Sequence, residues 1–157
     1  MGTTTQPAAL TIPAKYLEDA RSALIKEIEL DGEALRANQA DMRGHADPDP
    51  TDRDAAAILL RNDLAVLDQL LAATGSTTVS AEHHRGPLVE MLEAMVRILS
   101  ERLADVVQYG PIPMGEVLDV ATQLRWAAEE AIGLEPSMAH RLTRAEWRHI
   151  QTGREAA

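Results

Sequence analysis

The sequence contains no cysteine and no phenylalanine, and aromatic residues make up only 3% of its 157 residues. Without cysteine, the chain can form no disulfide, no thiolate metal site and no cysteine nucleophile. Without phenylalanine, its core must consist of Leu, Ile, Val, Ala and Met. These residues suit packing between helices better than the core of a β-sandwich, which favours aromatic and β-branched residues. The composition therefore favours an all-α fold.

Long apolar runs and excess basic charge are also lacking. No apolar stretch approaches the roughly 20 residues of a transmembrane helix, and residues 1–6 do not show the basic and then apolar pattern of a secretory signal peptide. The net charge of -10 disfavours binding to nucleic acid or to an anionic membrane surface. We therefore expect a soluble, cytoplasmic protein that binds itself or another protein, with no nucleic-acid or membrane partner.

Apolar residues recur at helical spacing in four segments, and proline or glycine stands at the junctions between them. Because short connections favour antiparallel neighbours, the pattern predicts an all-α, antiparallel up-down bundle of four main helices. A capping-box pattern at Thr143-x-x-Glu146 predicts a short C-terminal helix in addition. The four main helices are expected near residues 13–43, 53–74, 87–109 and 113–133.

Composition divides the chain into three parts. Residues 1–12 are expected to form a disordered N-terminal tail, residues 13–136 the helical bundle domain, and residues 137–157 a basic segment with the short helix. The basic segment carries about +2 and the rest about -12, which together give the net charge of -10.

Three charged residues fall on the apolar faces of the predicted helices, namely Asp31, Asp63 and Arg102, and Asn38 flanks the first of these faces. An isolated buried charge is costly, so we expect all three to be buried, with Arg102 in contact with at least one aspartate. Such a cluster is either a polar pocket for a small ligand, an anion or a metal, or an ion pair that fixes the register of the helices. The structural alternative is favoured, because structural networks often place charges in this way.

Other polar stretches do not match known metal or catalytic motifs. The acidic loop from His45 to Asp54 lacks the glycine and the final glutamate of an EF-hand. The adjacent His83 and His84 would point in different directions from a helix. No serine–histidine–aspartate triad or phosphate-binding loop can be assembled either. We therefore expect no metal, no cofactor and no catalytic residue.

One acidic pattern resembles that of a known family. Glu90-x-x-Glu93, followed by Glu116-x-x-Asp119, is similar to the pattern of the all-α nucleotide pyrophosphohydrolases of the MazG type. The resemblance covers only these two short stretches, and it implies Mg²⁺ binding by the four carboxylates. The helical periodicity, however, places all four opposite the apolar faces, whereas a metal site inside the bundle needs them on the inner faces.

Tryptophan and charge together predict a contact surface. Trp126 falls on the polar face of its helix, and Trp147 lies in the basic segment with Arg144 and Arg148. We expect the C-terminal helix to dock on an acidic surface that contains Trp126, either in its own subunit or in a homodimer. The leading functional hypothesis is a non-enzymatic interaction or assembly module. The alternative is a small-ligand-binding or metal-dependent helical enzyme with a polar site inside the bundle.

Overall fold

The computed structural model describes residues 7–43, 50–109 and 114–142, with the side chains of residues 7–33, 57–105 and 114–142. Helices dominate these residues, which confirms the predicted all-α class and the four main helices. Residues 138–142, at the end of the described chain, are helical as well. The elements are β1 (Ala9–Ile12), the 3₁₀ helix η1 (Ala14–Tyr16), α1 (Leu17–Arg43), α2 (Pro50–Ala72), β2 (Thr77–Ser80), α3 (Ala81–Tyr109) and α4 (Met114–Leu134).

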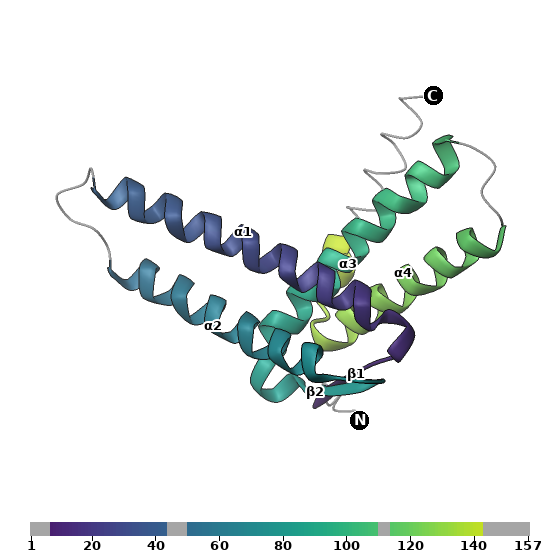
Figure 1. Ribbon diagram of the computed structural model, residues 1–157, viewed down its shortest axis with the longest axis horizontal. Helices are drawn as coiled ribbons and strands as arrows, with labels where there is room; N and C mark the ends of the chain where they lie inside the picture. The colour runs from purple at the N-terminus through teal and green to yellow at the C-terminus, as the bar shows by residue number, and fades with distance from the viewer. Residues whose placement is uncertain (1–6, 44–49, 110–113, 143–157) are drawn as a thin grey trace.

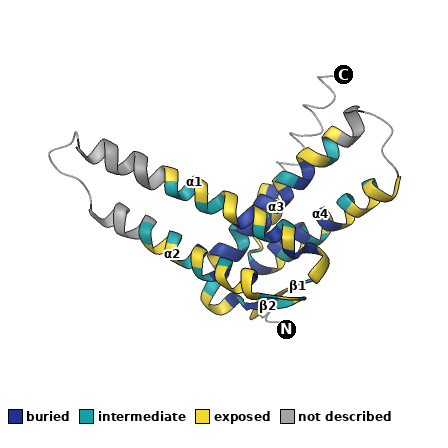
Figure 2. Cartoon of the chain, in the orientation of Figure 1, coloured by how far each residue is buried: buried dark blue, intermediate teal, exposed yellow. Residues whose placement is uncertain are grey.

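The helices group into two hairpins. In Figure 1, α1 lies beside α2 and α3 lies beside α4, and the two hairpins meet near the small sheet and diverge away from it. Helix α3 packs against each of the other three helices. Its apolar residues surround most of its circumference where it crosses the core, as expected of a helix with several neighbours. The buried residues concentrate where the hairpins meet (Figure 2) and include Met91, Leu92, Ala94, Met95, Val96 and Leu99 of α3.

The N-terminal segment forms a strand. β1 pairs with β2 in an antiparallel two-stranded sheet, and Leu10 and Ile12 point from β1 into the core. The prediction that residues 1–12 form a disordered tail is therefore wrong for β1, whereas residues 1–6 lie outside the described residues. Leu10 and Ile12 have the period-two spacing of a half-buried strand, but the run is short and its partner strand is distant in the sequence.

Helix α3 begins earlier than predicted. The expected start at Pro87 lies inside the helix, which begins at Ala81 and departs from helical geometry at His84 (φ -130°, ψ 31°). Proline is tolerated in the first turn after such an interruption, because a backbone N–H at that position would have no carbonyl acceptor within the helix. Pro87 therefore lies in the first turn after the kink at His84, and the turn before the kink extends α3 back to Ala81.

The start of the basic segment belongs to the same core as the helices. After the turn at residues 136–137, Met138 and Leu142 are buried in that core. Within the described ranges, no helix is both long enough and apolar enough to cross a membrane.

Candidate metal centre

Three carboxylates from three different helices converge. Asp31 of α1, Asp63 of α2 and Glu90 of α3 each place an oxygen atom within 4.8 Å of the other two. Asp63 is completely buried, whereas Asp31 and Glu90 are half-buried. We call these three residues the carboxylate triad. It lies where the α1–α2 hairpin packs against α3.

Helical spacing brings each triad residue to this point. Asp31 stands seven residues, or two turns, after the buried Leu24 of α1, and Asp63 stands seven residues before the buried Leu70 of α2. The sequence therefore correctly placed both aspartates on apolar faces, and the structure brings them together. Glu90 stands seven residues before Arg97 on α3, and Arg97 reaches across to α1. That face of α3 is turned toward the hairpin.

Three oxygens of the triad are buried without a hydrogen-bond partner. Neither carboxylate oxygen of Asp63 has a hydrogen-bond donor, and Oε2 of Glu90 is also buried without one. Within the described part of the chain, no lysine, arginine or histidine forms an ion pair with any triad residue. Buried carboxylates in proteins are normally hydrogen-bonded or paired with a cation. The triad is therefore an uncompensated group of acidic side chains.

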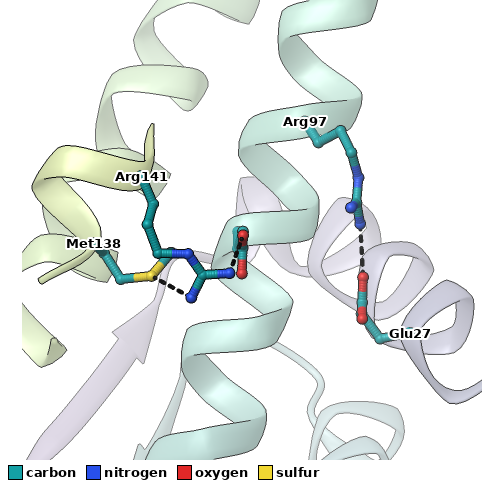
Figure 3. Close-up of polar contacts among 5 residues, drawn as sticks. Glu27, Arg97, Met138 and Arg141 are labelled. Atoms are coloured by element: carbon teal, nitrogen blue, oxygen red, sulfur yellow. Dashed lines mark hydrogen bonds and ion pairs between the residues drawn. The ribbon is translucent and has the colours of Figure 1, made fainter. Parts of the chain in front are cut away.

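Two neighbouring carboxylates, by contrast, each form an ion pair with an arginine. Arg97 donates to Glu27 of α1 at 2.7 Å, and Arg141 donates to Glu93 of α3 at 3.1 Å. Figure 3 shows both contacts, together with the second contact of Arg141, to the sulfur of Met138. Arg97 and Arg141 thus pair with the two glutamates beside the triad, and no arginine among the described side chains pairs with the triad itself.

Burial and mutual repulsion make the triad hard to ionise. Burial raises the pKa of Asp63 to about 8. The neighbouring carboxyl of Asp31 contributes to this rise, because the two carboxyl groups can hydrogen-bond to each other only while one of them is protonated. Burial likewise raises the pKa of Glu90 to about 7, with further increases from the charges of Asp31 and Glu27. The triad therefore holds a proton near neutral pH unless another cation takes its place.

The donor set limits which cation that is. All three side chains offer carboxylate oxygen, with no sulfur or imidazole among them. Hard ions such as Mg²⁺, Mn²⁺ and Ca²⁺ prefer oxygen ligands, whereas Zn²⁺ and Cu²⁺ favour sites that include nitrogen or sulfur. The chemistry of the triad therefore fits a hard divalent cation.

Arg102 does not join the aspartates, so its predicted contact with them is wrong. It is half-exposed, and its nearest acidic partner is Asp19 of α1 at 3.9 Å. Arg102 lies twelve residues after Glu90, about 18 Å farther along α3 at the usual helical rise, which puts the triad out of its reach. Asp19 also accepts a hydrogen bond from the buried Gln123 at 2.8 Å. The side chain of Asn38, the fourth residue of the predicted cluster, lies outside the described residues.

Trp126 does not stand on an open polar face as predicted. It is half-buried against the core, and its ring centroid lies 5.1 Å from that of Tyr16. The predicted inner face of α4, with Val117, Leu124 and Ala128, is right for the buried Leu124, but the buried positions also include Gln123 and Ala127, which turns this face closer to Trp126. The remaining residues of the predicted contact surface, Trp147, Arg144 and Arg148, lie outside the described residues. Docking of the C-terminal helix stays a prediction.

Glu90 is the triad residue that the sequence analysis missed as a site residue. Helical periodicity predicted outward positions for Glu90, Glu93, Glu116 and Asp119, which is wrong for Glu90. The other three do not join it: Glu93 binds Arg141, and Glu116 and Asp119 are exposed on α4. The four-carboxylate site implied by the resemblance to MazG-type enzymes is therefore not formed. The sequence does show that Glu90 and Arg97, seven residues apart, share one face of their helix. It does not show that this face meets α1.

No protein-family model matches the chain, and no curated protein or solved structure matches it either. Its function is therefore proposed from the site itself.

Proposed function

We propose that this chain is a divalent-cation-binding helical protein in which Asp31, Asp63 and Glu90 hold the ion. The observation that carries the proposal is the state of Asp63: its side chain is fully buried, neither oxygen has a donor, and two further carboxylates converge on it. A cation at this point would give the buried oxygens the partner that they lack and would replace repulsion among three acids by attraction.

The arrangement favours Mg²⁺, Mn²⁺ or Ca²⁺ with incomplete protein coordination. Three carboxylates supply at least three oxygens, and these ions take six or more ligands. Asp31 and Glu90 are only half-buried, so water can complete the coordination from their side. Because each ligand comes from a different helix, a bound ion would also fasten the α1–α2 hairpin to α3.

Mn²⁺ titration tests the proposal. We expect purified protein, freed of metal with a chelator and held at pH 8, to bind Mn²⁺ with loss of the free-ion electron paramagnetic resonance signal. We also expect the melting temperature to rise as the ion is added. Asp63→Asn should abolish both effects. Asp105→Asn removes the same charge from an exposed position on α3 and should leave both effects intact.

The amide introduced by Asp63→Asn is neutral, so this variant can fold without metal, and its apo form should be at least as stable as the wild type at pH 8. The proposal fails if wild-type protein leaves the Mn²⁺ signal unchanged. It fails equally if Asp63→Asn binds as tightly as Asp105→Asn does.

The expectations of a non-enzymatic interaction or assembly module and of a cytoplasmic location remain proposals beside this one. The cation site assigns a ligand and no reaction, so it is compatible with a non-enzymatic role. The cytoplasmic location rests on the acidic charge and the lack of cysteine.

A further inference from the structure

Helix α2 carries a row of leucines that its own chain covers only in part. Leu60, Leu64, Leu67 and Leu71 follow one another at intervals of four, three and four residues, which is the spacing of the a and d positions of a coiled coil. We call them the α2 leucine stripe. Leu64 is 44% exposed and Leu71 57% exposed, whereas Leu60 and Leu67 are half-buried.

The stripe is distinct from the face of α2 that builds the core. Asp63, Val66 and Leu70 form that buried face. Leu64 and Leu71 each come one residue after a member of it, so they lie about 100° around the helix. The core of the described chain thus leaves the stripe as an apolar flank of the hairpin.

Helix α1 also carries an exposed apolar residue on the side that faces α2. Arg21 of α1 donates to the carbonyl oxygens of Leu70 and Ala73 at 2.8 and 2.9 Å, which shows that this side of α1 faces the end of α2. Ile25 follows Arg21 by one turn on that side and is 41% exposed. Ile25 is therefore a further exposed apolar residue of the hairpin, on the side of α1 that faces α2.

Charged residues border the stripe in a self-complementary order. Arg61 and Asp68 each follow a stripe leucine directly, and they stand seven residues apart on one flank, in the equivalent of e positions. Both are exposed, and neither forms an ion pair with any residue that the structure describes. One copy therefore presents a positive and a negative charge at the two ends of the same apolar row.

We propose that the α2 leucine stripe docks a second copy of this chain, with the two α2 helices antiparallel about a twofold axis. With the axis between Leu64 and Leu67, Leu60 lies opposite the partner's Leu71 and Leu64 lies opposite the partner's Leu67. In an antiparallel pair the e flanks adjoin, so Arg61 comes within one helical turn of the partner's Asp68. The twofold symmetry repeats this contact at the other end of the interface.

The oligomeric state of the full chain tests this arrangement. Sedimentation equilibrium should give the mass of a dimer for the wild type and of a monomer for Leu71→Glu, because the substitution places two charges in the apolar row. Leu118→Glu on α4 is the matched control, since Leu118 is 58% exposed and lies outside the stripe. It should remain dimeric. Circular dichroism should show the same helix content in both variants, because both leucines are exposed in the monomer.

Charge reversal tests the register. Arg61→Asp alone and Asp68→Arg alone should each weaken the dimer about tenfold, since each sets like charges together at both ends of the interface. The double variant Arg61→Asp/Asp68→Arg restores both opposite pairs and should return the dissociation constant to near the wild-type value. A parallel or unrelated interface does not predict this rescue.

The inference is overturned by a monomeric wild type, by a Leu71→Glu variant that stays dimeric, or by a double variant that is no tighter than the single ones. A further outcome also overturns it: hydrogen exchange shows the stripe protected in a monomer, and this protection is lost when residues 143–157 are removed. In that case the chain's own C-terminal segment covers the stripe. The dimer does not rest on the proposed cation site, so Asp63→Asn should remain dimeric in the presence of a chelator.

Discussion

Arg97 of α3 donates to Glu27 of α1 at 2.7 Å, one helical turn before Asp31, and yet no ion pair joins it to the carboxylate triad. The charge of Glu27 is still close enough to raise the pKa values of Asp63 and Glu90. The contact therefore joins α1 to α3 beside the triad and leaves the negative charge of the triad uncompensated.

The apo protein should lose stability as the pH rises. An acid whose pKa is higher in the folded than in the unfolded state binds more protons when folded, so the free energy of unfolding decreases as it ionises. For Asp63 the stabilising contribution is complete below about pH 4 and is lost as the pH rises to about 8; Glu90 adds the same trend up to about pH 7. Urea denaturation in a chelating buffer at pH 5, 6, 7 and 8, at fixed protein concentration, measures this loss. Asp63→Asn should flatten the profile, and equal slopes for the two proteins would contradict the assigned pKa of Asp63.

Cation binding should release protons. With the pKa values of Asp63 and Glu90 raised to about 8 and about 7, the apo triad is partly protonated at neutral pH, and the ion must displace those protons. Mn²⁺ should therefore bind more tightly at pH 8 than at pH 6. Calorimetry at pH 7 in two buffers with different ionisation enthalpies counts the protons released. Binding that is equally tight at both pH values and releases no protons would exclude the triad as the site.

Replacing Arg102 should have only a small effect. Its 3.9 Å contact with Asp19 is between half-exposed side chains, and such surface pairs contribute about 0–1 kcal/mol. Arg102→Met should therefore lower the free energy of unfolding by less than about 1 kcal/mol. Gln123→Ala should cost more, about 1–3 kcal/mol, because it removes the buried donor to Asp19. Chemical denaturation of the two variants compares them, and a larger loss for Arg102→Met would reverse this ranking.

The N-terminal strand should contribute to stability. Ile12 is fully buried in the core, and truncating a buried isoleucine usually costs about 2–5 kcal/mol. Ile12→Ala should therefore destabilise the protein by about 2–5 kcal/mol. Thr11→Ala is the neighbouring control: it removes only an exposed contact to Thr78 and should cost less than about 1 kcal/mol. Equal and small effects in thermal or urea denaturation would mean that the strand does not dock in solution.

Local features of the sequence predicted the positions of the helices, whereas they did not predict the positions of the strands. Apolar spacing and the Gly and Pro residues between segments predict α1 to α4 to within a few residues at most ends. β1 and β2 are four residues each, and they are held by pairing between segments far apart in the chain. A short strand has little periodicity of its own, so its stability depends on a partner that no local pattern identifies.

The sequence by itself determined the helical class and the placement of Asp31 and Asp63 on apolar faces, because helical periodicity is a local property of the chain. Only the tertiary structure decided which charged residues meet. Glu90 joins the aspartates and Arg102 does not, because the rotation and axial position of α3 against α1 and α2 are set by the packing of the whole core. The contact of Trp126 with Tyr16 depends on the same packing. Such contacts join side chains from separate helices, and their energies depend on burial that exists only once all the helices have packed.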